Sequence, residues 1–239
     1  MTALPHAERH GADDVLEIYD RAAGRYDLVN AIASLGTGRW YRERTIRTLD
    51  LPEDAAVLDV GCGTGALALA AQRHCPESSL VVGVDPSEEM RTLARRAGVR
   101  DVRAGGFESL PFTDASFDLV TSGYAIRYAG DLGETARELK RILKPGGRLV
   151  LLEMIAPTTP WLRALVGRGI RSVGAPVLGM LCGSRAVTDL MRHFWDSVDG
   201  FAAPSVVVRS LRSAGLVEAE YRPLGGLLGE FRAARPDDD

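Results

Sequence analysis

The sequence predicts one α/β domain whose core is a doubly wound, mostly parallel sheet of seven strands. Short apolar runs alternate with helical patterns through the centre of the chain, and this rhythm is typical of parallel strands joined by crossover helices. Hydrophobic content of 46% and charged content of 26% over 239 residues are values of a globular chain that can bury a full core. No repeat at a solenoid period is visible. These observations exclude disordered, fibrous and repeat architectures.

The first four strands of the predicted sheet lie before residue 123. Apolar runs predict them at Ala56–Val60, Leu80–Val84, Val99–Ala104 and Phe117–Ser122. An alanine- and leucine-rich pattern predicts a helix over Thr64–His74. A second helix is expected to run from Ser87 to Arg96, because serine is a good N-cap and Glu88 and Glu89 favour the first turn.

The second half of the sheet follows the same logic. A helix is predicted over Asp131–Leu143, and Pro145-Gly146-Gly147 is expected to end it. The remaining elements are expected to be a strand at Arg148–Met154, a helix at Ser205–Ala214 and final strands at Val217–Pro223 and Gly226–Ala233.

Two segments lie outside this rhythm and suggest additions to the sheet. Residues 1–49 are expected to form an N-terminal helical cover. Residues 156–203 are rich in glycine, proline and arginine and lack strand periodicity, so they are expected to form an inserted helical lid over the substrate. The core would then comprise residues 50–155 and 204–234.

Charge and cysteine content restrict the partners. A net charge of −3 argues against a nucleic acid. Three scattered cysteines form neither a disulfide framework nor a zinc pair, and no cluster of acids and histidines suggests another metal. The longest apolar stretch, Trp161–Cys182, is interrupted by three arginines and Pro176, so stable membrane insertion is not expected. A cytoplasmic location is the default, and a homodimer stays open.

The sharpest local signal is the run Val57-Leu58-Asp59-Val60-Gly61-Cys62-Gly63-Thr64-Gly65, where a strand turns into a helix. Glycines suit such a turn because they adopt positive φ and let a ligand approach the backbone. The helix start near Thr64 offers free N–H groups to an anion. Asp85 ends the next strand, where a carboxylate can accept hydrogen bonds from two ribose hydroxyls. Together they predict a nucleoside-type cofactor at the carboxyl edge of the sheet.

The glycine turn alone leaves alternatives open. Gly61-x-Gly63-x-x-Ala66 also satisfies a dinucleotide fingerprint, and a glycine turn can exist without a ligand. Three features favour S-adenosylmethionine over NAD or FAD. Gly65 gives a G-x-G-x-G spacing, and Asp59 stands where a methionine ammonium could use it. Too few residues follow the fifth strand for a separate catalytic domain.

Further motifs extend from about Tyr19 to about Ala233. They are Tyr19-Asp20, Arg25-Tyr26-Asp27, Leu28-Val29-Asn30, Val84-Asp85-Pro86-Ser87, Met90, Glu108-Ser109-Leu110-Pro111-Phe112, Phe117-Asp118, Ile126-Arg127, Asp131, Arg141 to Arg148 and Leu224-Gly225-Gly226-Leu227. With Asp59 to Gly65, they make the chain resemble class I S-adenosylmethionine-dependent methyltransferases. More narrowly, it resembles the ubiquinone/menaquinone-biosynthesis C-methyltransferase family. The resemblance implies a Rossmann-like sheet and S-adenosyl-L-methionine as cofactor.

The resemblance also implies roles for single residues at the cofactor. The methionine half would contact Asp59, Gly61, Gly63 and Thr64, with Cys62 in the same turn. Asp85 would hold the ribose, and Pro86, Ser87 and Met90 would line the adenine, although Met90 fits plain core packing as well. Phe107 falls beside the adenine amino group. The family has Asn or Asp before it, where Gly106 stands here, so backbone atoms or water would read that group.

Residues near the transferred methyl group come from two places. By resemblance, Ser122 and Tyr124 end the fourth strand beside the sulfonium. Tyr26 could close over the cofactor or merely staple the N-terminal cover to the core. The segment His193–Val198 departs from the family's Y-L-x-E-S-I pattern, and Tyr128 replaces an asparagine. We therefore expect a refitted acceptor pocket, open to a natural-product intermediate as well as to a quinol.

The expected function is methyl transfer to carbon or oxygen of a lipophilic aromatic or enolic small molecule. Positioning supplies most of the acceleration, and a general base ionises the acceptor. His193 is the candidate base, with Asp196 one helical turn on to fix its tautomer, although a packing role for His193 is the rival interpretation. Tyr124 and Tyr26 are the other candidates. The alternative function is a protein that binds S-adenosylmethionine without methyl transfer, for a cyclisation or as a non-catalytic partner.

Overall fold

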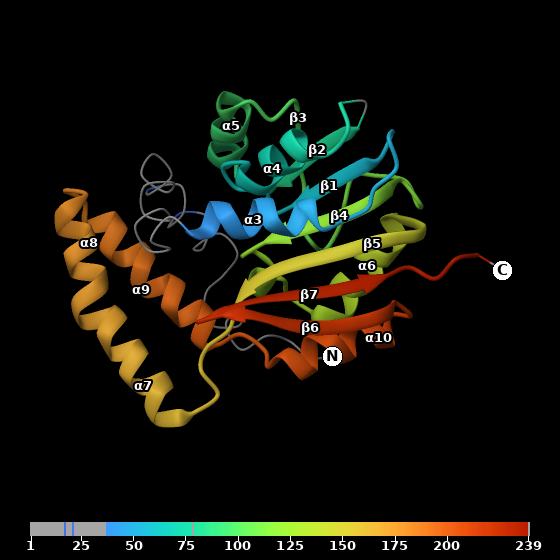
Figure 1. Cartoon of the computed structure of the whole chain (residues 1–239). Coiled ribbons are helices and arrows are strands. Elements are labelled where there is room, and N and C mark those ends of the chain that lie inside the picture. The colour runs from blue at the N-terminus through green and yellow to red at the C-terminus, as the bar shows by residue number, and fades with distance from the viewer. Residues whose placement is uncertain (1–16, 18–20, 22–36, 78, 239) are drawn as a thin grey trace.

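The computed structural model describes residues 17, 21, 37–77 and 79–238. Within them the strands form one seven-stranded sheet in the order β3-β2-β1-β4-β5-β7-β6. The five strands from β3 to β5 are parallel, whereas β7 runs antiparallel to β5, and β6 runs antiparallel to β7 (Figure 1). The order reverses between β1 and β4, which is where α/β sheets bind ligands. The predicted fold class is confirmed.

The strands lie close to their predicted positions. They are β1 (Ala56–Val60), β2 (Leu80–Asp85), β3 (Asp101–Ala104), β4 (Phe117–Gly123), β5 (Leu143–Met154), β6 (Val217–Gly225) and β7 (Leu228–Ala234). The helices around the sheet are α3 (Thr37–Arg47), α4 (Ala66–His74), α5 (Glu88–Ala97), the 3-10 turn η2 (Ile126–Tyr128), α6 (Leu132–Ile142) and α10 (Pro204–Ser213).

Capping residues explain where two of these helices begin. The Ser87 hydroxyl accepts a hydrogen bond from the Met90 N–H at the start of α5. The Asp131 carboxylate accepts from the N–H groups of Gly133 and Glu134 at the start of α6. Both side chains satisfy amide groups that a helix end leaves without intrahelical partners.

Three strand starts differ from the prediction, and the simplest case is β7, which begins at Leu228 rather than Gly226. β5 begins at Leu143 rather than Arg148, because Leu143 already pairs with Phe117 and the Gly147 carbonyl accepts from the Arg235 N–H. The register shifts between Phe117 and Leu119, so the Pro145-Gly146-Gly147 segment forms an irregularity inside the strand. β3 begins at Asp101 rather than Val99. The Val99 N–H donates instead to the Ala94 carbonyl and closes the end of α5.

Helices cover both faces of the sheet. On one face α6 and α10 pack against residues such as Leu58 and Val120. On the other face α3, α4 and α5 pack against Val57 and Leu119. Neighbouring residues of one strand thus point into different cores, and both faces are apolar, as a doubly wound sheet requires.

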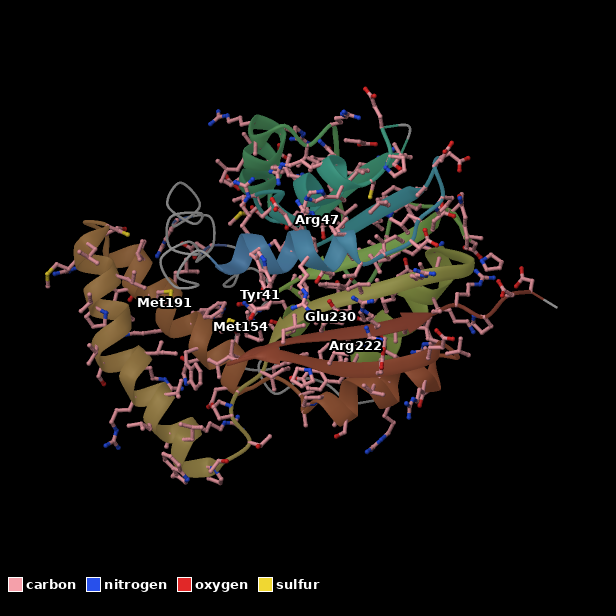
Figure 2. The ribbon with its side chains drawn as sticks, viewed as in Figure 1. Tyr41, Arg47, Met154, Met191, Arg222 and Glu230 are labelled. Carbon is pink, nitrogen blue, oxygen red and sulfur yellow. The ribbon has the colours of Figure 1, made fainter. Side chains whose placement is uncertain are left out.

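The N-terminal cover is described only in part. Helix α3 lies across the sheet near the β6–β7 hairpin (Figures 1 and 2). The Tyr41 hydroxyl donates to the Leu224 carbonyl over 3.0 Å, and the Thr45 hydroxyl donates to Glu230 over 2.8 Å. Most of the expected cover, residues 1–49, lies outside the described residues.

A helical insertion leaves the sheet where β5 ends at Met154 (Figures 1 and 2). It consists of α7 (Pro160–Gly169), the π-helical turn η3 (Ile170–Gly174), α8 (Ala175–Leu181) and α9 (Arg185–Asp199). A small core of Ala175, Leu178, Val187 and Met191 joins α8 to α9. In the described part of the chain, no helix is both long and apolar enough to cross a membrane.

Candidate functional site

The three glycines of the turn after β1 have different tasks. Gly61, Gly63 and Gly65 have φ of 66°, 53° and 86°. A Cβ on Gly61 would lie 2.5 Å from Ala125 Cβ, and one on Gly65 would lie 2.4 Å from Val99 Cγ2. A Cβ on Gly63 would meet no described atom within 4 Å. Gly61 and Gly65 therefore permit close packing, whereas Gly63 turns bare backbone toward open space that a ligand can occupy.

The Asp85 carboxylate shapes this turn from the end of β2. One oxygen accepts a hydrogen bond from the Gly63 N–H over 2.8 Å, and the other accepts from the Ser87 N–H over 3.0 Å. A carboxylate offers about four acceptor positions, so it retains capacity for ribose hydroxyls. The same side chain that would hold a nucleoside thus also holds the glycine turn in place.

Asp59 lies buried beneath the turn. Its two oxygens accept hydrogen bonds from the Ala68 N–H of α4 over 3.0 Å and from the Thr121 hydroxyl over 3.1 Å. Burial raises the pKa of this carboxyl from 3.8 to about 7, against the lowering effect of both hydrogen bonds. Through its hydrogen bonds the carboxyl connects β1 to α4 and β4. Because its pKa is about 7, a small change in its surroundings changes its charge at neutral pH.

The end of β4 combines an unpaired hydroxyl with a strained residue. Ser122 is fully buried, and its hydroxyl has no hydrogen-bond partner among the described atoms. Tyr124 has φ of 63°, a conformation that costs a residue with a Cβ about 1–2 kcal/mol. Burial raises the pKa of the Tyr124 phenol. Strain and unsatisfied polar groups concentrate at functional sites.

A buried ion pair that the sequence did not predict lies beside Tyr124. Arg127 of η2 pairs with Glu153 of β5 over 2.6 Å, and both side chains are fully buried. The same guanidinium donates to the Tyr124 carbonyl and, over 2.9 Å, to the Ser197 hydroxyl of α9. Burial raises the pKa of Glu153, which Arg127 opposes. Arg127 thereby connects β4, β5 and the helical insertion.

The signal for this pair is present in the sequence but weak. Glu153 is the one carboxylate in the apolar run Leu149–Met154, and acids are seldom buried in a parallel strand without a partner. The partner, Arg127, follows an equally apolar Ala125-Ile126. Only the structure shows that these positions meet.

His193 joins the same cluster. It is 5% exposed, and its ring stacks on Tyr128 with centroids 6.0 Å apart and planes 7° apart. The Tyr128 hydroxyl lies 3.1 Å from the Ser197 hydroxyl. Asp196, the expected orienting carboxylate, accepts instead from Arg171 over 2.9 Å. Tyr26, the third predicted catalytic residue, lies outside the described residues.

Comparison with known proteins decides the family. A model of the ubiE/COQ5 methyltransferase family matches residues 7–231. The chain belongs to this family. It is 33% identical over 224 residues to the demethylmenaquinone methyltransferase of Symbiobacterium thermophilum, an alignment that covers 88% of this chain and 87% of that protein. It is 32% identical to the ubiquinone/menaquinone biosynthesis C-methyltransferase of Geobacter sulfurreducens, over 87% of this chain and 82% of that one.

Solved structures agree on the fold. A methyltransferase of Thermotoga maritima, described as a possible histamine N-methyltransferase, superposes with a TM-score of 0.64 at 22% identity, over 92% of this chain and 98% of that chain. Phosphoethanolamine N-methyltransferase 2 of Haemonchus contortus, solved with S-adenosyl-L-methionine, gives 0.60 at 15% identity, over 83% of this chain and 53% of that one. The chain is thus an S-adenosylmethionine-dependent methyltransferase with a Rossmann-like fold.

The residues in and around the turn after β1 fit S-adenosylmethionine. Parallel strands share one carboxyl edge, so the open backbone at Gly63, the Asp85 carboxylate and the unpaired Ser122 hydroxyl all lie along it. The start of α4 adds N–H groups of positive polarity for the carboxylate end of an amino acid. These groups match the ribose and amino-acid parts of S-adenosylmethionine.

The other predicted cofactor residues of this methyltransferase follow the ends of β1, β2 and β3. Thr64 and Met90 are buried, and Pro86 is exposed. A Cβ on Gly61 would come within 3.8 Å of the Phe107 ring, so Phe107 lies against the turn. A Cβ on Gly106 would lie 3.2 Å from the Glu108 carboxylate, so an acid lies close to Gly106 although the residue itself has no side chain.

Cys62 has a packing role in this turn. A Cβ on Gly83 would come within 2.9 Å of the Cys62 sulfur, so the thiol fills the space over β2. Burial raises its pKa, and the neighbouring carboxylates of Asp59 and Asp85 raise it further. The thiol therefore stays protonated and is unsuited to act as a nucleophile.

Proposed function

We propose that this methyltransferase transfers a methyl group to a ring carbon of a lipophilic hydroquinone. The observation that carries the proposal is the contact between the glycine turn after β1 and the segment that follows β4. Gly61 packs on Ala125, and the same short segment supplies Tyr124, Arg127 and Tyr128. The curated relatives named for demethylmenaquinone support the substrate class.

Residues of the turn hold the cofactor in this proposal. Asp85 accepts hydrogen bonds from the ribose hydroxyls, and Gly63 lets the ligand approach the backbone. A positive charge near Asp59 would lower the pKa of its carboxyl and leave it ionised. Ser122 offers its hydroxyl beside the reacting centre. When bound, S-adenosylmethionine supplies a methyl group on a positively charged sulfur. Because the neutral thioether that departs is already a good leaving group, the protein contributes mainly the orientation of the reactants.

The residues around Arg127 bind and deprotonate the acceptor in this proposal. His193 takes the proton of the acceptor hydroxyl, and the resulting oxyanion makes the neighbouring ring carbon more nucleophilic. Once methylated, that carbon gives up its ring proton, the acceptor oxygen takes a proton back, and the ring is aromatic again. Tyr124 keeps its own proton at neutral pH, because burial raises its pKa, so it donates a hydrogen bond to an acceptor oxygen. Tyr128 positions His193 by stacking on its ring, and Arg127 positions α9 through its hydrogen bond to Ser197.

The insertion of residues 156–203 acts as the lid. His193 and Ser197 both lie on α9, and the Arg127–Ser197 hydrogen bond fastens α9 to the carboxyl edge of the sheet. Closing α9 on that edge assembles the cluster and excludes water. Limited proteolysis checks this: cofactor with acceptor should protect the segment, and ligand-independent cutting would contradict a lid. Residues 1–49 would cover the cofactor from the other side, in a cytoplasmic enzyme.

Label transfer tests the function. The purified chain is incubated with S-adenosylmethionine carrying a labelled methyl group and with chemically reduced demethylmenaquinone. The label should enter the quinol, and the oxidised quinone should accept none, because it has no hydroxyl proton to lose. Cofactor binding without transfer to any acceptor would instead favour the non-catalytic alternative.

The Tyr128–His193 stack favours a second candidate acceptor, a lipophilic phenol or polyketide-like enol. These two aromatic rings stand at positions where the resemblance leads us to expect different residues, so the pocket differs from a typical quinol site. A matched phenol in the same assay separates the two. Faster transfer to its oxygen than to the quinol carbon would replace the first proposal.

A further inference from the structure

Large apolar side chains gather on the outer side of the helical insertion. Six of them are between 46% and 80% exposed: Trp161, Leu165, Val173, Val177, Met180 and Leu181. Trp161 and Leu165 are four residues apart, as are Val173, Val177 and Leu181, which places each set on one helical face. We call these six residues the outer lid face. It lies on α7, η3 and α8, the part of the insertion that projects away from the sheet (Figure 1).

The outer lid face is separate from the core of the insertion. The inner side of the insertion is already packed, because Ala175 and Leu178 of α8 contact Val187 and Met191 of α9. The other exposed large hydrophobic residues of the described chain, Trp40, Leu80 and Val217, lie far apart in sequence on different elements. Single exposed apolar residues are ordinary, whereas a continuous exposed patch indicates an interaction surface.

The charge of the segment is equally uneven. No aspartate or glutamate occurs between Glu153 and Asp189, although the chain has 32 acidic residues. The same stretch carries four arginines. Arg163 and Arg171 pair with Asp199 and Asp196 of α9, so these two are neutralised within the insertion. Arg168 of α7 and Arg185 at the start of α9 are exposed and form no ion pair among the described residues, so the stretch between Glu153 and Asp189 has net positive charge.

We propose that the outer lid face docks on an anionic phospholipid surface. Its apolar side chains would enter the boundary between headgroups and acyl chains, while Arg168 and Arg185 meet the phosphates. Trp161 has the amphipathic ring that favours this boundary. A protein partner would match the apolar area, but the lack of any carboxylate on an otherwise acidic chain favours an anionic surface.

This inference rests on the proposed function for its purpose. A hydroquinone with a long apolar tail resides in a bilayer, and a lid that rests on the bilayer could receive it without passage through water. The docking itself is measured without any acceptor. Vesicle binding with no methyl transfer would overturn only the proposed function, and transfer to detergent-dispersed quinol with no vesicle binding would overturn only the docking.

Vesicle sedimentation tests the apolar half. The full chain should bind vesicles of phosphatidylglycerol and phosphatidylcholine more tightly than vesicles of phosphatidylcholine alone. The triple variant L165Q/M180Q/L181Q should bind at least tenfold more weakly, because three inserted side chains become polar. Leu80→Gln changes an exposed leucine on β2, outside the outer lid face, and should leave binding unaltered. Thermal unfolding and cofactor affinity of all variants should match the parent chain.

The charged half has its own matched pair. R168Q/R185Q should weaken binding by about fivefold for each arginine. The control R96Q/R209Q removes two exposed arginines on other helices and should change little. In a Trp40→Phe background, Trp161 is the exposed tryptophan, since Trp195 is buried, and brominated lipids should quench it.

Three results would overturn the proposal. The first is failure of the parent chain to bind anionic vesicles at physiological salt, and the second is a triple variant that binds as well as the parent. The third is a dimer in ultracentrifugation that the triple variant dissociates, with no vesicle binding by either form. That result would assign the outer lid face to a second copy of the chain.

Discussion

At the scale of single residues, side chains with similar sequence signals have different roles. Gly61 and Gly65 are glycines because a Cβ would collide with Ala125 or Val99. Gly63 has no such neighbour, so only its positive φ and a bound ligand constrain it. The sequence predicts all three glycines but cannot separate packing from binding, because the colliding atoms come from distant segments.

Gly63→Ala tests the binding role of the turn. The strain of a left-handed alanine should lower stability by about 1–2 kcal/mol. Gly183→Ala is the matched control, since Gly183 also has positive φ and meets no described atom within 4 Å. Denaturant unfolding should show similar losses for both, and calorimetry should show at least tenfold weaker cofactor binding for Gly63→Ala alone. Equal cofactor affinity in the two variants would remove Gly63 from the site.

Asp59→Asn tests the buried carboxyl through pH. The pKa is about 7 in the folded chain and 3.8 in the reference state, so the folded chain holds the proton more tightly. Stability contributed by Asp59 is therefore present at low pH and lost as pH rises toward 7. Asparagine has no such loss, because its amide oxygen can accept from the Ala68 N–H while its amide nitrogen donates to the Thr121 hydroxyl. Between pH 5 and 8, the variant should gain about 2 kcal/mol relative to the parent in urea unfolding. A constant difference would contradict the raised pKa.

His193→Phe separates a general base from a packing ring. Phenylalanine keeps the stack on Tyr128 but cannot take a proton. Turnover should fall by at least about a hundredfold with unchanged cofactor affinity, and the acidic limb of the pH–rate profile should disappear. Turnover within a few-fold of the parent would restrict His193 to packing.

At the scale of elements, the Arg127 cluster holds the insertion on the sheet. Helix caps and apolar periodicity are local, so the sequence predicts α5, α6 and most strand bounds. The start of β5 at Leu143 and the fastening of α9 to the sheet depend on partners elsewhere in the chain, namely Phe117, Arg235 and Arg127. Local patterns carry no signal for such long-range pairing.

Removing members of the cluster should have graded effects. Ser197→Ala removes one hydrogen bond to a buried cation and should lower stability by about 2 kcal/mol. Glu153→Gln leaves the Arg127 charge without its counter-ion and should cost about 3–5 kcal/mol. Denaturant unfolding measures both, with the exposed Ser213→Ala as a near-neutral control. A smaller loss for Glu153→Gln than for Ser197→Ala would show that the ion pair is not the main contact.

At the scale of the whole molecule, the doubly wound sheet brings two functions to one edge. The sequence predicts the sheet, the cofactor and the family, because glycine spacing and strand rhythm are continuous along the chain. The acceptor side is assembled from η2, β5 and α9, and no single stretch encodes it. The exposed apolar face of the insertion follows from the same cause, since only packing against α9 shows which side of α8 remains outside.

The position of the transferred methyl group shows whether the enzyme methylates a ring carbon of a hydroquinone. S-adenosylmethionine with a ¹³C-methyl group is turned over with reduced demethylmenaquinone, and the carbon spectrum of the product is recorded. We expect a methyl carbon attached to the aromatic ring, formed at least tenfold more slowly by the Gly63→Ala variant at the same subsaturating cofactor concentration. A methyl carbon attached to oxygen, or no labelled product while cofactor binds, would contradict methyl transfer to a ring carbon of a hydroquinone.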